Sequence, residues 1–174
     1  AKIISFEKGD LSDPGTTIVG PFEDSMHKSV TMHPEPISVV AVVGENMLNQ
    51  VGLLSKITTV IYNAGINIYG ISAGQNSITA FLDKDDADEA YHLLHNLVIA
   101  EDSLSSISLG RDIAMLTMIN PDFIETPGVI TEITNPLKEN HINIVEISSS
   151  QTAIVLFINW EDGKVAYKDE NGEW

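Results

Sequence analysis

The chain contains the same short pattern twice, as GINIYGIS at residues 65–72 and as HINIVEIS at residues 141–148. Shifting the sequence by 76 positions superimposes the two copies without a gap, and residues 37–81 then overlie residues 113–157. The identical pairs are Ile37/Ile113, Gly52/Gly128, Ile57/Ile133, Thr58/Thr134, Ile66/Ile142, Asn67/Asn143, Ile68/Ile144, Ile71/Ile147, Ser72/Ser148, Gln75/Gln151, Ile78/Ile154 and Phe81/Phe157. Self-similarity at a fixed period predicts a tandem duplication of one structural unit.

Periodicity predicts the elements of one unit. The β-branched run ISVVAVV is typical of a buried strand, and apolar residues at three- and four-residue spacing before Gly65 predict an amphipathic helix. Further on, INIYGIS and SITAFL are predicted as strands, DKDDADEAYHLLHNLV as an acid-capped helix and SSISL as a short strand. This order, strand-helix-strand-strand-helix-strand, predicts an α+β, ferredoxin-like unit whose antiparallel sheet carries both helices on one face. The elements span residues 37–43, 51–64, 66–72, 77–82, 83–98 and 105–109.

The second copy lacks a final strand, whereas the first copy is preceded by a surplus one, SVTM at residues 29–32. An unpaired strand exposes backbone donors and acceptors, so we expect the surplus strand to complete the second unit and to interlock the two. The predicted divisions are an N-terminal segment (1–28), a first unit (29–110) and a second unit (111–174) that stops after the start of its second helix.

Composition excludes several classes of function. The chain has 9 basic and 25 acidic residues, a net charge of −16 that would repel the phosphates of nucleic acid. It has no cysteine, which excludes disulfides, thiolate nucleophiles and Cys-based metal sites. There is no membrane-length apolar run and no signal-peptide pattern, so we expect a cytoplasmic protein without membrane partners.

These motifs resemble the paired ACT domains of the aspartokinase regulatory region. VVGENM, VGLLSKI and AGINIYGIS follow that family's order of strand, loop, helix and second strand, and TPGVITEI with HINIVEIS repeats it in the second copy. DADEAYHLLH resembles the family's second helix, and the interlocked N-terminal strand is also a family feature. KIISFEKGDLSDPGTTIVG, within the N-terminal segment, resembles the end of the aspartokinase catalytic domain.

The resemblance implies an allosteric regulatory region or subunit of aspartate kinase that is not an enzyme by itself. It implies lysine or threonine as amino-acid effector, feedback control of aspartate-family amino-acid biosynthesis, and no cofactor. We expect a homodimer formed through the edges of the ACT sheets, because open antiparallel edges invite pairing. The resemblance also implies an aspartokinase catalytic chain as a partner.

The loop between first strand and first helix is the predicted effector site in each unit. A glycine there allows close backbone approach, and a helix N-terminus offers N–H groups to a carboxylate. In the second loop Asp122 and Glu125 could receive an ammonium group, whereas the first loop offers Glu45 and asparagines. The resemblance adds contacts from the two asparagines that begin the second strands. The candidate effector-binding residues are Asn46, Met47, Asn49, Gly52, Asn67, Ile68, Asp122, Glu125, Gly128, Asn143 and Ile144.

An alternative function is a non-sensing assembly module of another amino-acid metabolic enzyme. Ala73 and Ser149 favour it, since they stand where the family usually places glutamine. Asn67 and Asn143 also suit a purely structural turn before a strand. No Ser-His-Asp or phosphate-loop spacing is present, and His92 with His95 has no third residue to complete a metal site.

Overall fold

The computed structural model describes residues 2–3, 16–17 and 29–171. Within the segment 1–28 the structure describes only a two-residue ladder between β1 (Lys2–Ile3) and β2 (Thr16–Thr17). Most of the stretch that resembles the end of a catalytic domain therefore lies outside the described residues. The remaining elements are β3 (Ser29–Met32), β4 (Ile37–Gly44), η1 (Met47–Asn49), α1 (Leu53–Asn63), β5 (Ile68–Ala73), β6 (Ser77–Asp83), α2 (Ala87–Ala100), β7 (Leu104–Ile119), η2 (Pro121–Ile124), α3 (Val129–Glu139), β8 (Ile144–Ser149), β9 (Ala153–Asn159) and α4 (Trp160–Asn171).

Two equivalent stretches of the duplication lie antiparallel at the centre of the sheet. One stretch is β3 followed by β4, and both pair with β7. Ile37 is the register partner of its own counterpart Ile113, and Ser29 is the partner of Ile119. The strand that precedes the first copy therefore lies beside the strand that opens the second copy, which is the pairing that an interlocked duplication requires.

The sequence suggested a short strand at residues 105–109 and a separate strand from Ile113, but β7 is one strand of 16 residues. It stays continuous because β4 pairs with its first part and β9 with its second part. Ile37 pairs with Ile113, but Val39 pairs with Gly110, so β7 has one residue more than β4 between these two pairs. This extra residue forms a bulge, where Asp112 has a φ of 56°. Such a bulge bends the strand where the two halves of the sheet meet.

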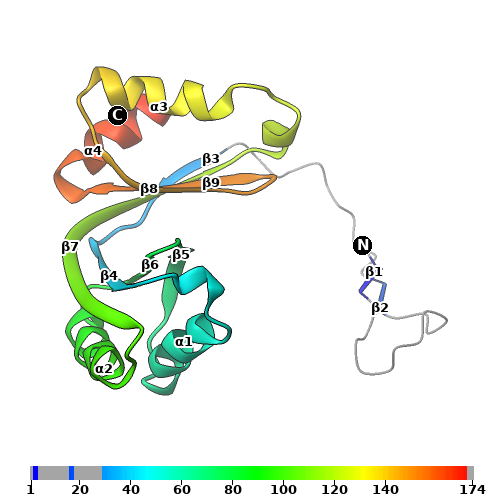
Figure 1. Cartoon of the computed structure of the whole chain (residues 1–174). Helices are drawn as coiled ribbons and strands as arrows, with labels where there is room; N and C mark the ends of the chain where they lie inside the picture. Colours follow the sequence, from blue (N-terminus) through cyan, green and yellow to red (C-terminus); the bar gives the residue numbers. More distant parts are fainter. Residues whose placement is uncertain (1, 4–15, 18–28, 172–174) are drawn as a thin grey trace.

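The sheet order is β5-β6-β4-β7-β9-β8, with β3 also on β7. Figure 1 shows α1 and α2 at one end of the molecule and α3 and α4 at the other, with the sheet between them and β7 curving from one half to the other. We call β4, β5, β6, α1, α2 and the first part of β7 the first unit. The second unit contains β3, β8, β9, α3, α4 and the last part of β7. The α+β, ferredoxin-like prediction is confirmed for the arrangement as a whole.

Each unit has its own core between its half of the sheet and its helices, and a third cluster joins the two halves of the sheet. Alternate residues of a strand point to opposite faces, so Val40 and Val42 lie in the first core while Ile37 lies in the joining cluster. There Phe81 stacks on its counterpart Phe157 with ring centroids 3.7 Å apart. The units are thus related by an approximate two-fold axis, and some positions are identical because each residue packs against its own copy.

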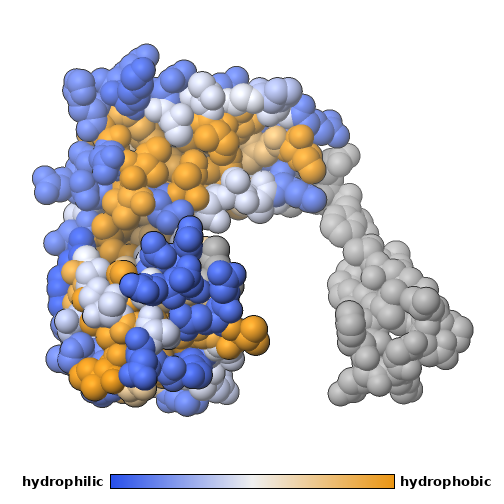
Figure 2. Space-filling model, in the orientation of Figure 1, coloured by the Kyte–Doolittle hydropathy of each residue, from blue (hydrophilic) through white to orange (hydrophobic). Residues whose placement is uncertain are grey.

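The space-filling view shows hydrophobic residues gathered between α3 and the sheet of the second unit (Figure 2). None of the helices within the described residues is long and apolar enough to cross a membrane.

Candidate functional site

Both predicted effector loops end in a glycine that caps the following helix. Gly52 precedes α1 with a φ of 85°, and Gly128 precedes α3 with a φ of 90°. Side chains rarely tolerate this left-handed conformation, so glycine suits both positions. Neither helix receives a hydrogen bond from a side-chain cap. Within the described residues no side-chain cap occupies the N–H groups at the start of α3, whereas the first N–H of α1, on Leu53, already donates to the Gln50 carbonyl at 3.3 Å.

The first loop is closed by contacts of its own. Met47 is 3% exposed and packs in the core of the first unit, so its side chain is a core residue rather than a surface contact. Its backbone N–H donates to the carbonyl of Gln75 at 2.8 Å, and the Gln50 side chain donates to the carbonyl of Glu45 at 2.9 Å. Asn46 and Asn49 are exposed at the loop surface.

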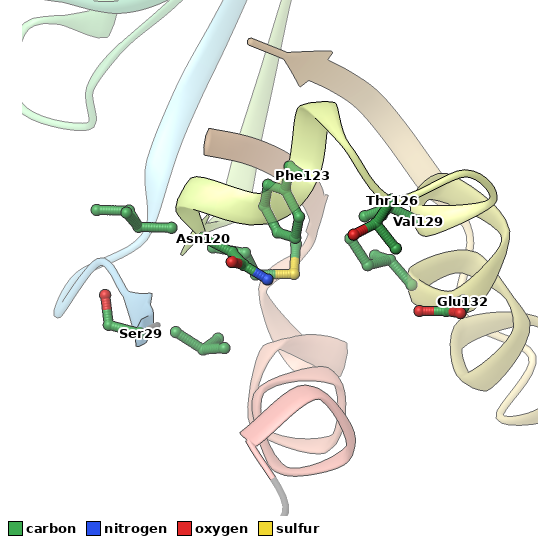
Figure 3. Close-up of a pocket in the computed structure, with 10 residues that line it drawn as sticks. Ser29, Asn120, Phe123, Thr126, Val129 and Glu132 are labelled. Atoms are coloured by element: carbon green, nitrogen blue, oxygen red, sulfur yellow. The ribbon is translucent and has the colours of Figure 1, made fainter. Parts of the chain in front are cut away.

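The second loop stands beside a cavity of about 360 Å³ (Figure 3). The Asn120 side chain accepts a hydrogen bond from the backbone N–H of Asp122 at 2.9 Å, and the Thr126 hydroxyl donates to the Asp122 carbonyl at 2.9 Å. These bonds hold the turn while Phe123 remains only half-buried. The cavity is lined by Ser29, Val30, Met118, Ile119, Asn120, Phe123, Thr126, Val129, Glu132 and Ile133.

The predicted residues of the second loop do not line this cavity. Asp122, Glu125 and Gly128 are exposed on η2 and at the start of α3. Instead, Thr126 and Glu132 place polar groups at its wall. Sequence reasoning missed both, and the only signal for Thr126 was its position directly before Pro127 and Gly128.

Asn67 and Asn143 are exposed just before β5 and β8, and neither lines the cavity. The residue before each Ile-Asn-Ile motif, Gly65 or His141, has positive φ and ends the preceding helix. The first isoleucine of the motif, Ile66 or Ile142, is buried in both units. The last isoleucine, Ile68 or Ile144, begins the strand and is half-buried. Burial of the isoleucines is one structural reason for the repetition of this motif.

The repeated serines line a smaller cavity of about 190 Å³ between the two halves of the sheet. Ser72 and Ser148 lie there with the stacked pair Phe81 and Phe157. Gly70 leaves room for this stack, because a Cβ on it would lie 3.0 Å from the Phe157 ring, closer than an ordinary contact.

A polar pair in the first unit has shifted pKa values. The Tyr69 hydroxyl donates to the Asp83 carboxylate at 3.2 Å, and the other carboxylate oxygen accepts from the backbone N–H of Asp85 at 3.0 Å. That backbone bond lowers the pKa of Asp83, and the Tyr69 bond lowers it further. Burial and the neighbouring carboxylate raise the pKa of Tyr69. In the second unit Val145 and Asn159 occupy the equivalent positions.

No group of three histidine, aspartate or glutamate side chains within the described ranges could hold a metal ion. His92 and His95 are exposed on α2, where Tyr91 packs near both rings.

Comparison with known proteins agrees with the tandem fold. Residues 40–97 and 108–168 each match a model of the ACT domain. Together these matches cover more than half of the chain, which belongs to the ACT-domain family. No curated protein sequence gives a significant match.

Solved structures give the more particular likeness. The regulatory subunit of aspartate kinase from Thermus thermophilus, in its ligand-free form, is 21% identical with a TM-score of 0.72, over 83% of this chain and 95% of that subunit. Aspartate kinase from Clostridium acetobutylicum is 17% identical with a TM-score of 0.74, over 80% of this chain and 33% of that one. E. coli aspartokinase III, in complex with lysine and aspartate, is 16% identical with a TM-score of 0.67, over 83% and 32%. The chain therefore spans about a third of the complete kinases, and its resemblance to aspartokinase regulatory regions is confirmed at the level of the fold.

Proposed function

We propose that this chain is the amino-acid-sensing regulatory region or subunit of an aspartate kinase. The tandem ACT arrangement supports this role, as does the likeness that extends over 95% of a separate regulatory subunit. The expected output is feedback control of aspartate-family amino-acid biosynthesis in the cytoplasm. Aspartate phosphorylation would be the work of a catalytic chain.

The observation that carries the proposal is the second effector loop. An uncapped helix N-terminus at Gly128 suits the carboxylate of an amino acid, because its N–H groups and dipole favour negative charge. Asp122 and Glu125 place carboxylates on the same loop for an ammonium group. Lysine or threonine is the proposed effector, and Asn143 is a proposed further contact supplied from the start of β8.

The proposed partner in assembly is a second copy of the chain. β5 and β8 are the first and last strands in the order of the described sheet, so each has one edge without a partner strand among the described residues. Ile71 on β5 and Val145 on β8 are 43% and 41% exposed. Pairing of such edges would satisfy backbone groups and cover these side chains. Sedimentation at micromolar concentration checks this, and a monomer alone would contradict it.

The alternative function is a non-sensing ACT module that only assembles another enzyme. The closed first loop supports it, because Met47 occupies the core and the Gln50 side chain holds the loop by donating to the Glu45 carbonyl. Ala73 and Ser149, in place of glutamine, support it as well. The two proposals differ in whether a free amino acid stabilises the chain.

Thermal unfolding with and without lysine or threonine tests whether the chain is an amino-acid sensor or a non-sensing assembly module. A ligand at 100 times its dissociation constant should raise the unfolding free energy by about 2.7 kcal/mol. Gly128→Val should abolish this increase, since the new side chain meets nothing in the fold and projects into the space the effector would use. Asn143→Ala should weaken it by removing an amide contact.

Gly52→Val is the matched control, because it imposes the same left-handed strain on the closed loop. Each variant's stability is measured without ligand, so backbone strain is separated from lost binding. Stabilisation that survives both Gly128→Val and Asn143→Ala would place the effector elsewhere. Stabilisation of the wild type by neither amino acid would favour the assembly module.

A further inference from the structure

A second polar cavity, of about 410 Å³, lies where α2 begins. β4 supplies its floor, and its walls come from the turn between β6 and α2, the first turn of α2 and the bulge of β7. Ser38 lies near the start of β4, whereas the first effector loop follows the end of that strand. Its lining residues are Ser38, Lys84, Asp85, Asp88, Arg111 and Asp112.

Ser38 is a polar residue in a place where polar groups normally have partners. It is 1% exposed, and within the described residues its hydroxyl oxygen has no hydrogen-bond partner. The register of β4 with β7 passes from Ile37 to Val39 at the bulge, so no residue of β7 is the register partner of Ser38. Buried hydroxyls without a partner are uncommon and costly, so this one needs an explanation.

The duplication shows that the strand does not require a hydroxyl here. Ala114, the counterpart of Ser38, is 0% exposed in the second unit. A Cβ on Gly163 would lie 2.9 Å from the Ala114 Cβ and 2.6 Å from the Met32 Cε, so this counterpart floor is packed and apolar. The polar floor is a property of the first unit alone.

The charges around the cavity favour a positively charged ligand. Both basic residues are already paired, Arg111 with Asp88 at 2.6 Å and Lys84 with Glu35. The Asp85 and Asp112 carboxylates accept no hydrogen bond from the described part of the chain. An anion would meet paired cations and three carboxylates, whereas a cation gains from the negative field.

We propose that this cavity binds a small organic molecule through a primary ammonium group, which donates to the Ser38 hydroxyl oxygen and to the carboxylates of Asp85 and Asp112. An ammonium group has three donors and no acceptor, which suits three oxygen acceptors. An inorganic cation is disfavoured, because the described residues include no cluster of three metal-ligating side chains. The site is separate from the proposed effector loops and does not depend on them.

Titration calorimetry on the full chain tests this with three probes. 1,4-Diaminobutane carries only ammonium groups, 6-aminohexanoate adds a carboxylate, and butanoate carries a carboxylate alone. We expect binding of 1,4-diaminobutane and none of butanoate. Binding of 6-aminohexanoate as tight as the diamine would show that the natural ligand can be zwitterionic, and weaker binding would show that it is purely cationic. Tighter binding of butanoate than of the diamine would overturn the proposal.

Variants separate this site from general attraction to an acidic protein. Ser38→Ala copies the natural counterpart Ala114, so it should fold, and we expect diamine affinity to fall about fivefold. Asp112→Asn should lower affinity about tenfold while keeping the left-handed backbone, which asparagine also tolerates. Asp102→Asn, an exposed acid in the turn after α2, is the charge control and should change affinity little. The proposed site would be contradicted if Ser38→Ala bound the diamine as tightly as the wild type. It would also be contradicted if Asp112→Asn and Asp102→Asn lost diamine affinity equally.

Gly128→Val must leave diamine binding unchanged. A lost amino-acid response together with intact diamine binding would count against the proposed function and not against this cavity. Loss of diamine binding in Gly128→Val would place the ammonium site at the effector loop instead.

Discussion

The two units share a backbone plan at their effector loops but differ in what fills the space beside them. Both loops end in a glycine at the N-cap position of the following helix, with no side-chain cap and with nearly the same φ, 85° and 90°. In the first unit Met47 enters the core, whereas its counterpart Phe123 is half-buried beside a cavity of about 360 Å³. The identical glycines thus give both loops the same backbone entry into the helix, whereas the differing residues Met47 and Phe123 pack differently beside it.

A similar difference occurs at the starts of α2 and α4, but here the cavity is in the first unit and the packed counterpart is in the second. There the first unit has the buried hydroxyl of Ser38 and the second has Ala114. A duplicated fold can therefore carry different chemistry at equivalent places without changing its framework. The following experiments test how independent the two units are.

Removing β3 should have the largest effect. Deleting residues 1–32 removes the ladder opposite Leu116–Ile119 and takes Val30 and Met32 from the second core. We expect the second unit to unfold although the deletion is closer in sequence to the first. Hydrogen exchange should show lost protection in β9 and retained protection in β4.

Deleting only residues 1–28 is the control, because it leaves β3 in place, and it should preserve protection in both units. Lost protection in β4 with protection kept in β9 would mean that β3 serves the first unit.

The stacked phenylalanines should give the next largest effect. Phe81→Ala or Phe157→Ala removes a buried ring from the cluster between the two halves of the sheet and should cost about 3–5 kcal/mol of unfolding free energy. Because the rings stack on each other, the double variant should show a coupling of about 0.5–1.5 kcal/mol in denaturant unfolding.

Phe123→Ala is the matched control, since Phe123 is half-buried and lies outside this cluster. It should cost less than either variant. If the losses of unfolding free energy in Phe81→Ala and Phe157→Ala add exactly in the double variant, the stacking contact does not stabilise the two halves of the sheet against each other.

Much of the fold follows from the sequence because the repeat exposes it. The offset between Ile37 and Ile113 predicts two similar units, and the surplus strand predicts their exchange. The continuity of β7 could not be predicted, since it arises from long-range pairing with β4 on one side and β9 on the other. Sequence also could not separate the buried Met47 from the half-buried Phe123, because both are large and apolar and only packing decides.

The acid response should be the smallest effect and should distinguish the units. The backbone N–H of Asp85 and the Tyr69 hydroxyl lower the pKa of Asp83 in the folded chain. A carboxyl with a lowered folded pKa contributes stability at pH values above its unfolded pKa, about 3.9, and this contribution is lost as the pH falls through the folded pKa. Asp83→Asn keeps an oxygen acceptor but cannot titrate. The difference in unfolding free energy between wild type and Asp83→Asn should therefore shrink as the pH is lowered below about 4.

Asn159→Asp is the matched control in the second unit, because it places a carboxyl at the equivalent position beside Val145, which has no hydroxyl to donate. Denaturant unfolding from pH 3 to pH 6 should show a smaller acid-dependent difference for Asn159→Asp than for Asp83→Asn. Tyr69→Phe should also reduce the acid dependence due to Asp83, since it removes one of the two bonds that favour the ionised carboxylate. The backbone bond from Asp85 should preserve the larger part, because it is the greater cause of the lowered pKa. If Asp83→Asn and wild type differ by the same amount at every pH, the carboxylate of Asp83 gains nothing from these bonds, and the two units respond to acid alike.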